Sequence, residues 1–472
     1  MPSGSEPRSL VVLGAGLSGL AAAWRLSEIY RERVVVIEKN SYVGGLAASV
    51  SRLGRQFDLG SHRIHHSIAP EMLALIRELC GGELQERMRE GLILVDGRFI
   101  RYPPRPADLL RGLGLGKCAL YTAGMIAARM RKLFVGKDAE SFESYILSNL
   151  GRPLYTSFYE PYARKLWGVS PHILSDESAK KRIRRVIVTE LKRLGDTKRD
   201  WRYFYPAKGI GAIAEGLKYR IMQNGGRIVL DADVTKLETH AGQEVSAVHF
   251  RTKSGTESIK IENLISTIPP DALSHLLDAE KPADISFGLR WRALRILFLE
   301  TRDAIERRPE TYYVSSPDYL AGRISEIAKY SPNLNPEDGW KAFTIEIPCT
   351  QDDEIWRMDE QQLAMRCAKE LAEFGIIRST FSEPPHCASM VLDHVYPFYA
   401  VGWQEQYAAV CAYFSSFSNL YRIGRTALFL HCNLDHSIAM GLKLGTWLTQ
   451  SNRNRDDWLR DENQFRDYYV RE

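Results

Sequence analysis

The order of apolar runs and glycines at the beginning of the chain predicts a strand, a helix and a second strand. Residues 9–38 read SLVVLGAGLSGLAAAWRLSEIYRERVVVIE, in which an apolar run, a glycine loop, an alanine-rich segment and a β-branched run follow one another. Short apolar runs bounded by glycine are typical of buried strands, and the longer alanine-rich segment is typical of a helix. The pattern therefore predicts a βαβ unit.

The pattern changes twice further along the chain. Residues 69–80 (APEMLALIRELC) have helical spacing, and residues 91–103 (GLILVDGRFIRYP) predict a short hairpin. Helical patterns then continue, so we expect a mainly helical insertion at 67–203. Apolar and polar positions alternate between residues 280 and 400, which is typical of an antiparallel sheet. The fold class expected is α/β, with a separate antiparallel substrate-binding domain at 280–400.

The glycines between the first strand and the helix have the spacing of a dinucleotide-binding loop. Gly14 allows a tight turn, Gly16 lets the backbone approach a pyrophosphate, and Gly19 permits close packing of helix and strand. The N-terminus of the helix offers free N–H groups to the phosphates. Glu38 ends the second strand 19 residues after Gly19, about where an acid meets ribose hydroxyls. Because all these parts occur in order, we predict a dinucleotide site.

The composition is that of a globular protein with more than one domain. The chain has 472 residues, too many for one ordinary core, so we expect two or three domains. Its 44% hydrophobic and 26% charged residues are typical of soluble proteins. A net charge of +5 over this length is too small to indicate nucleic-acid binding. We therefore expect no nucleic-acid partner.

Cysteine usage and apolar runs bear on location. The seven cysteines include no CxxC pair, so neither a disulfide framework nor a zinc knuckle is indicated. The N-terminus lacks the features of a signal peptide, and no uninterrupted apolar run reaches the roughly 18 residues that span a bilayer. We expect a reducing, cytoplasmic location. Residues 112–134 are apolar and end in basic residues, which favours a buried helix, with weak membrane-surface association as the alternative.

The segment after Glu38 distinguishes between dinucleotides. NSYVGGLAAS at 40–49 contains Gly44 and Gly45, and RLGRQFDLGSH follows at 52–62. This succession resembles the flavoprotein clan that contains amine oxidases, protoporphyrinogen oxidase and UDP-galactopyranose mutase, in which an acid, a short loop and a Gly-Gly pair wrap FAD. The resemblance implies that FAD is the cofactor.

Three later segments resemble the same clan in the expected order. They are FYPAKGIGAIAEGL at 204–217, GGRIVLDADVTKLE at 225–238 and NLYRIGRTALFLHCNLDHSIAMG at 419–441. Because all of them must meet around one cofactor, the resemblance implies a Rossmann-like FAD-binding domain that is discontinuous. This domain would consist of residues 8–66, 204–275 and 416–450, with 451–472 as a C-terminal tail.

The resemblance also assigns residues to the cofactor. Glycines and backbone groups of the two glycine loops would approach the phosphates, Val234 would contact the adenine through its backbone, and Asp435 would meet the ribityl and pyrophosphate side. The implied cofactor-binding residues are Gly14, Gly16, Leu17, Ser18, Gly19, Glu38, Lys39, Gly44, Gly45, Leu46, Gly60, Ser61, His62, Val234, Gly424, Arg425, Asp435, His436 and Ser437.

FDLGSHRIHH at 57–66 contains three of the eleven histidines of the chain. It is open to three interpretations: a flavin-facing loop, surface or core histidines, or a metal site. No acidic partner in HExxH-like spacing supports zinc, so no metal is expected. In the clan, the corresponding element leads toward the isoalloxazine ring. The implied catalytic candidates are His62 as an acid or base, and Arg63 and Arg323 as hydrogen-bond donors to an anion.

Substrate contacts are indicated by two further segments. PYARKLWGVSP at 161–171 resembles a "Y-x-x-K-x-W-G" segment of a bacterial subgroup grouped with protoporphyrinogen oxidase and found in UDP-galactopyranose mutases. Residues 181–186 resemble the "K-R-x-P-x-R" segment of the mutases, but the last arginine is replaced by valine. Core packing is the alternative for Trp167, and a structural ion pair is the alternative for Arg323. The substrate-binding candidates are Tyr162, Trp167, Arg182, Arg185 and Tyr205.

The resemblance implies an FAD-dependent oxidoreductase that transfers hydride from its substrate to flavin N5. Its substrate would be a polar small molecule, sugar-bearing or nucleotide-linked. Two alternatives remain: a non-redox mutase that acts on a nucleotide sugar, similar to UDP-galactopyranose mutase, and an FAD-stabilised scaffold without catalysis. The sequence leaves the oligomeric state open.

Overall fold

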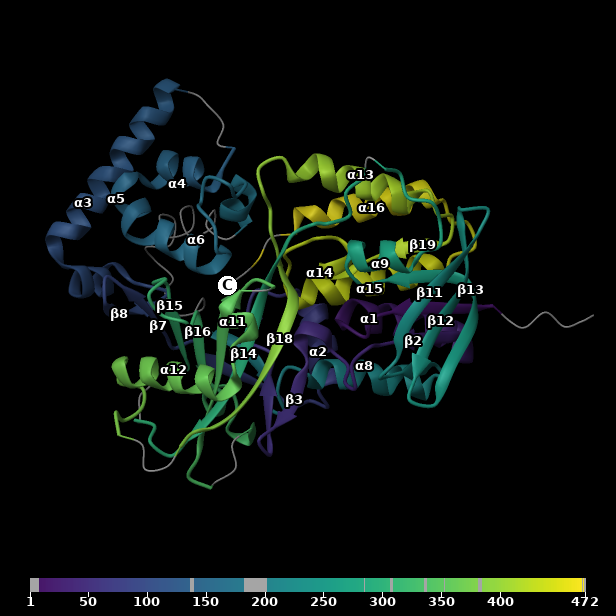
Figure 1. Ribbon diagram of the computed structural model, residues 1–472, viewed down its shortest axis with the longest axis horizontal. Coiled ribbons are helices and arrows are strands. Elements are labelled where there is room, and N and C mark those ends of the chain that lie inside the picture. Colours follow the sequence, from purple (N-terminus) through teal and green to yellow (C-terminus); the bar gives the residue numbers. More distant parts are fainter. Residues whose placement is uncertain are drawn as a thin grey trace, which may run out of the picture.

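The structure is a computed structural model that describes residues 8–135, 140–181, 202–283, 285–305, 309–334, 338–351, 353–380, 384–468 and 470. Figure 1 shows a sheet flanked by helices on one side of the molecule, a second sheet next to it, and a group of helices that includes α3 to α6 at the far edge. The expected α/β fold class is confirmed. Arg182 and Arg185 lie outside the described residues.

The first sheet is built from three separate parts of the chain. Its strands run in the order β10-β2-β1-β13-β12-β11, and β19 pairs with β13. β1 pairs in parallel with β2 and β13, so the predicted βαβ unit forms the centre of the sheet. The strands are β1 (Ser9–Leu13), β2 (Val34–Ile37), β10 (Arg227–Val229), β11 (Asp233–His240), β12 (Glu244–Thr252), β13 (Gly255–Ser266) and β19 (Leu420–Arg422).

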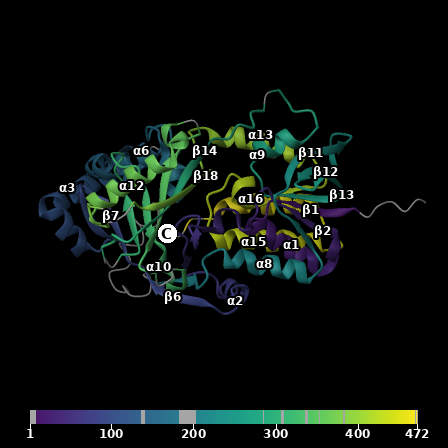
Figure 2. The same ribbon diagram turned by 60° about the horizontal axis from the view of Figure 1, so that its bottom comes forward.

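Helices cover both faces of this sheet, as the two views in Figures 1 and 2 show. Leu10 and Val12 pack on the side of α1, α8 and α15, while Val11 and Leu13 pack on the side of α9 and α13. Strand side chains alternate between faces, so an uninterrupted apolar run such as SLVVL fits a strand buried on both sides. The helices are α1 (Leu17–Tyr30), α8 (Ala212–Gln223), α9 (Pro270–Leu276), α13 (Trp403–Ser415) and α15 (Leu434–Leu448).

Helices α1 and α15 run in the same direction and pack unusually closely. A Cβ atom on Gly441 would lie 2.2 Å from the carbonyl oxygen of Ser18, and one on Gly445 would lie 2.7 Å from Cβ of Arg25. Glycine is therefore required at both positions of α15. The segment expected to be a tail also packs here: Trp458 of α16 (Arg455–Gln464) and Phe465, which begins the 3-10 turn after it, are buried in the same core.

The second sheet has the order β18-β14-β17-β16-β15-β7-β8. Its neighbours pair antiparallel except β7 and β15, which are parallel. The predicted hairpin at 91–103 is present and extends this sheet, so part of the segment expected to be a helical insertion belongs to the second sheet. The strands are β7 (Gly91–Val95), β8 (Arg98–Tyr102), β14 (Trp291–Thr301), β15 (Thr311–Val314), β16 (Arg323–Glu326), β17 (Lys341–Cys349) and β18 (His386–Pro397).

Shorter elements connect the two sheets. β3 and β4 form a hairpin, and β9 pairs with both β5 and β6. Of the remaining helices, α2 and α14 pack beside the helices of the first sheet, and the others lie beyond the second sheet or against it. These elements are β3 (Ser49–Arg52), β4 (Arg55–Asp58), β5 (Ile64–His65), β6 (Leu84–Met88), β9 (Arg202–Pro206), α2 (Pro70–Leu79), α3 (Pro106–Val135), α4 (Phe142–Leu150), α5 (Arg152–Leu154), α6 (Glu160–Trp167), α10 (Ile327–Tyr330), α12 (Glu360–Glu373) and α14 (Gly424–Ala427).

Candidate active site

The glycine loop between β1 and α1 contains two kinds of glycine. A Cβ on Gly14, which has φ +95°, would lie 2.3 Å from Oγ1 of Thr267, and a Cβ on Gly19 would lie 2.2 Å from the carbonyl oxygen of Gly14. A Cβ on Gly16 would meet nothing within 4 Å. Gly14 and Gly19 are therefore required by the protein's own packing, whereas Gly16 borders open space.

The second glycine loop lies directly on the first. The Gly44 N–H donates to the carbonyl oxygen of Ala15 at 2.8 Å. Gly45 has φ +57°, and a Cβ there would lie 3.2 Å from Cα of Gly16. Leu46 follows in a short 3-10 turn. The two loops thus form one glycine-lined surface at the N-terminus of α1.

Glu38 is buried at the end of β2 and faces the first glycine loop. Its carboxylate accepts hydrogen bonds from the Ala15 N–H at 2.7 Å and from the Asn40 N–H at 2.9 Å. The carbonyl oxygen of Glu38 accepts from the Ala232 N–H at 2.9 Å, which brings Val234 of β11 near this strand end. Lys39 is exposed.

The closing motif packs against the beginning of α1. Gly424 has φ +91°, and a Cβ there would lie 2.7 Å from Oγ of Ser18. The Arg425 guanidinium donates to the carbonyl oxygen of Val395 through Nε at 3.0 Å and Nη2 at 2.7 Å, and to that of Cys432 through Nη1 at 3.1 Å. Arg425 therefore ties this motif to β18, so it supports the site through backbone contacts.

Asp435, His436 and Ser437, expected to meet the cofactor at the start of α15, have different neighbours. The imidazole of His436 accepts from the Asn433 N–H at 3.3 Å and stacks on Tyr468, with ring centroids 4.3 Å apart. His436 is thereby part of the helix cap. Oγ of Ser437 lies 3.6 Å from Sγ of Cys432, and Asp435 lies in the first turn of the helix.

These residues fit FAD. The FAD segments that lie far apart along the chain meet at one edge of the first sheet. The first turn of α1 has no side-chain cap that would compete for its N–H groups. Glu38 lies at the strand end where a ribose would bind, and Gly16 leaves room for a pyrophosphate.

His62 lies where the loop after β4 meets the second sheet. The N–H of Ser61 donates to Oε1 of Glu346 at 2.8 Å, and Arg323 holds the same carboxylate through Nε at 2.7 Å and Nη2 at 2.5 Å. The His62 Nδ1 atom is 3.1 Å from the carbonyl oxygen of Gly60. Because a carbonyl only accepts, Nδ1 donates and Nε2 of the neutral imidazole has the free lone pair.

Burial and the nearby carboxylates shift the pKa of His62 in opposite directions. Burial lowers the pKa of His62, and the carboxylates of Asp58 and Glu346 oppose this only partly. Burial alone would raise the pKa of Glu346, but the Arg323 guanidinium outweighs it and lowers the pKa. His62 is therefore neutral near pH 7, beside an ionised carboxylate held by Arg323.

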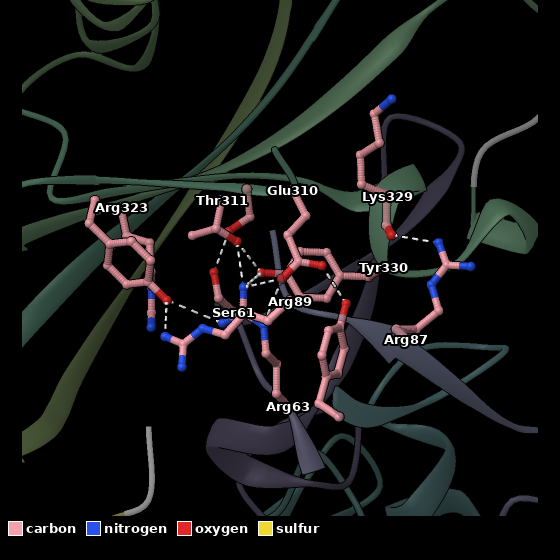
Figure 3. A network of polar contacts seen from close by, with 12 residues as sticks. Ser61, Arg63, Arg87, Arg89, Glu310, Thr311, Arg323, Lys329 and Tyr330 are labelled. Atoms are coloured by element: carbon pink, nitrogen blue, oxygen red, sulfur yellow. Dashed lines mark hydrogen bonds and ion pairs between the residues drawn. The ribbon is translucent and has the colours of Figure 1, made fainter. Parts of the chain in front are cut away.

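Arg63 belongs to a buried network, shown in Figure 3. Its guanidinium donates to Glu310 through Nε at 3.0 Å and Nη2 at 2.8 Å, and further to Thr311 at 2.7 Å and Tyr330 at 2.7 Å. The hydroxyl of Tyr203 donates to the other oxygen of Glu310 at 2.5 Å. This position corrects the expectation that Arg63 donates hydrogen bonds to an anionic group of the substrate, because its N–H groups already bind the protein itself.

The expected role of Arg323 is corrected in the same way. Its fork holds Glu346, so the structural ion pair that was the alternative for Arg323 is what the structure contains. Glu346 was missed from the sequence, although a carboxylate in the middle of the apolar strand KAFTIEIPC was a signal.

Arg89 was also missed. It follows β6, is 8% exposed, and donates through Nη2 to the hydroxyl of Tyr313 at 3.1 Å. Its Nε has no hydrogen-bond partner within the described part of the chain, where Arg89 also forms no ion pair. Tyr102 lies against the guanidinium, with its ring centroid 5.0 Å from Cζ. A buried guanidinium without a carboxylate is rare, because the desolvated charge is costly.

The aromatic candidates lie in packed positions. Tyr205 is buried and its hydroxyl donates to Asp58 at 2.5 Å, so it anchors the turn after β4, which corrects the expectation of a substrate contact. Trp167 is buried edge-on against Tyr396 and Phe398, which is the core packing weighed as its alternative. Tyr162 is half-buried and stacks on a neighbouring ring of its own helix segment.

Among the residues that the structure describes, no group of three or more His, Cys, Asp and Glu side chains could hold a metal ion. The rings of His65 and His66 lie 4.4 Å apart. Within the same residues, every helix is too short or too polar to cross a membrane.

A Rossmann-like sheet with two glycine loops on one helix N-terminus, faced by a second sheet, defines an FAD-dependent flavoprotein. The chain belongs to the family described as flavin containing amine oxidoreductase, whose model matches residues 17–394.

Individual relatives are more distant. The chain is 28% identical over 177 residues to the mitochondrial protoporphyrinogen oxidase of Nicotiana tabacum. This alignment covers 36% of this chain and 35% of the relative. It is 23% identical over 306 residues to the chloroplastic protoporphyrinogen oxidase of Oryza sativa subsp. japonica, covering 58% of this chain and 55% of the relative. The matches thus span about a third to about a half of the length of these relatives.

The fold is similar to that of a crystal structure of reduced UDP-galactopyranose mutase. The two chains superpose with a TM-score of 0.77 over 99% of this chain and 98% of the mutase, at 17% sequence identity. At this identity the likeness shows the fold. The fold class implied by the sequence resemblance is therefore confirmed over the whole chain.

Proposed function

We propose that the protein is an FAD-dependent oxidoreductase acting on a polar small molecule that is sugar-bearing or nucleotide-linked. The observation that carries the proposal is the neutral imidazole of His62, half-buried beside the Glu346–Arg323 pair at the end of the segment that leaves the Gly44–Gly45 loop. Bound FAD would accept a hydride from the substrate at N5. His62 would take the accompanying proton at Nε2.

Arg89 is the residue proposed to bind an anionic group of the substrate. Arg63 and Arg323 are each neutralised by a carboxylate, whereas Arg89 is buried without a carboxylate partner among the described residues. The guanidinium of Arg63 acts on Arg89 as a second positive charge. A phosphate or carboxylate would match the planar guanidinium and compensate its desolvated charge. This supports a substrate with such a group.

The experiment is a visible spectrum of the purified protein followed by an anaerobic substrate screen. UDP-galactose and porphyrinogens are the first compounds to test. Bleaching of the flavin by one compound, with recovery in oxygen or with another acceptor, is the expected result. A colourless protein that FAD cannot reconstitute would contradict the proposal.

A non-redox mutase activity is the second candidate. It is favoured by the full-length fold likeness and by the similarity of Gly60-Ser61-His62 to the histidine stretch of UDP-galactopyranose mutases. Such an enzyme turns over a nucleotide sugar only with previously reduced flavin, and it forms no stoichiometric hydrogen peroxide. Product formation by the dithionite-reduced protein, without bleaching of the oxidised protein, would select this candidate.

A further inference from the structure

Helix α3 lies at the outer edge of the molecule, far from the first sheet (Figure 1). After a bend at Gly114, its inner side packs through Tyr121, Met125 and Ala128. Its outer side is exposed and strongly apolar, with Leu133 81% and Phe134 84% exposed. The large exposed apolar side chains after the bend are Leu115, Leu120, Ile126, Met130, Leu133 and Phe134.

These side chains form one continuous face. At 100° per residue, all six fall within an arc of about 140°, and the alanines at positions 119, 123 and 127 fall in the same arc. From Leu115 to Phe134 the helix is about 28 Å long, because it rises 1.5 Å per residue. Single exposed apolar residues are ordinary, but a contiguous face of this size marks an interaction surface.

Charges border this face on both sides. On the helical wheel, Arg129 lies about 40° before the apolar arc and Arg131 about 20° after it. Both arginines are exposed, and neither forms an ion pair with another described residue. No acidic residue occurs between Leu109 and Val135. The border of the apolar face is therefore positive.

We propose that this face of α3 docks on an anionic phospholipid surface, with the helix axis parallel to the membrane. The apolar side chains would enter the acyl boundary while Arg129 and Arg131 bind headgroup phosphates. In a symmetric contact between two copies this face would meet itself, and the same stretch of the second copy contains no acidic side chain to pair with the arginines. The sequence favoured a buried helix here, and the structure separates a packed inner side from this free outer side.

The test is co-flotation of the flavin-loaded full chain with vesicles. One set of vesicles consists of phosphatidylcholine, and the other contains phosphatidylglycerol at about a third of the lipid. The expected result is binding to the anionic vesicles at least tenfold stronger than to the neutral ones, weakened by 0.5 M salt. The double variant L133S/F134S and the double variant R129Q/R131Q should each lose at least tenfold in binding.

Matched controls use side chains of the same kind elsewhere on the surface. I29S/M222S removes two exposed apolar side chains from α1 and α8, and R31Q/R378Q removes two exposed arginines; both should bind as the unchanged protein does. Flavin absorbance reports folding of every variant. The proposal is overturned if anionic vesicles do not bind the protein or if L133S/F134S binds them equally well. A concentration-dependent dimer that L133S/F134S disperses, without vesicle binding, would assign the face to a second copy instead.

Discussion

Two opposing effects act on the pKa of His62. Burial favours the neutral imidazole, while Asp58 and Glu346 favour the charged one, and burial prevails. Arg323 adds to the effect of burial, because its positive charge also lowers the pKa of His62. The side chains around His62 thus keep its imidazole neutral at neutral pH, as the proposed role as a base requires.

We expect His62→Gln to lower the rate of substrate oxidation by roughly 100-fold or more, since general base catalysis contributes about that much. In the unchanged protein, the rate should be constant above pH 6.5 and fall at lower pH, where His62 becomes protonated. The variant should lack this acid limb. The pH dependence of flavin bleaching measures both effects, with His65→Gln as the control. An acid limb that persists in His62→Gln would argue against the assigned base.

Arg63 permits a prediction about stability. Arg63→Gln would leave the Glu310 carboxylate buried without its cation, and we expect a loss of about 3–5 kcal/mol in the free energy of unfolding. Urea denaturation measures it. The control Arg8→Gln removes an exposed pair with Glu244 and should cost about 1 kcal/mol or less. Unchanged stability together with lost turnover would return Arg63 to the catalytic residues.

At the scale of elements, the two glycine loops and the N-terminus of α1 act together. Gly14, Gly19 and Gly44 are required because backbone or side-chain atoms occupy the space a Cβ would need. Gly16 differs, since its missing side chain leaves space that the protein does not fill. Because this space adjoins the second glycine loop, we expect the cofactor to occupy it.

Gly16→Ala should separate folding from cofactor binding. The residue has φ −71°, so alanine fits the backbone, and the apoprotein should unfold at the same urea concentration as before. FAD affinity, measured by quenching of flavin fluorescence, should fall at least tenfold because the methyl group would occupy the pyrophosphate side. Gly116→Ala, at another open glycine, should leave FAD affinity unchanged. Equal FAD affinity in Gly16→Ala would show that the cofactor lies elsewhere.

At the scale of the whole molecule, charged side chains tie the second sheet to the rest of the fold. Arg55 of β4 pairs with Glu300 of β14, and both side chains are almost fully buried. His394 of β18 lies between Asp393, at 2.9 Å, and Asp271 of α9, at 3.9 Å. Burial alone would lower the pKa of His394, but the two carboxylates outweigh it and raise the pKa to about 9. This contact links the second sheet to α9, which covers one face of the first sheet.

The contribution of His394 should depend on pH. Because its pKa is higher in the folded protein than the ordinary 6.5, its protonation stabilises the fold fully below pH 6.5 and no longer above about pH 9. His394→Gln should be less stable at pH 6 by on the order of 2 kcal/mol, allowing for solvent screening. The difference should vanish at pH 10. Urea denaturation at both pH values measures it, and an equal difference at both would contradict the assignment.

The sequence by itself determined the parts that depend on short-range pattern. The βαβ unit, the glycine loops, Glu38 and the hairpin at 91–103 are each encoded within a few dozen residues, because strand, helix and turn preferences are local. The resemblance extended this to the order of the FAD segments, so the class of protein could be predicted from sequence.

Only the tertiary structure decided what each charged or aromatic side chain does. Arg63 meets Glu310 and Arg323 meets Glu346 across strands that come together only in the folded chain, so their neutralisation could not be read from local pattern. The same holds for the unpaired Arg89 and for the exposed outer side of α3. Burial and ion pairing depend on residues far apart in the sequence, and these determine whether a charge serves the fold, the substrate or a surface.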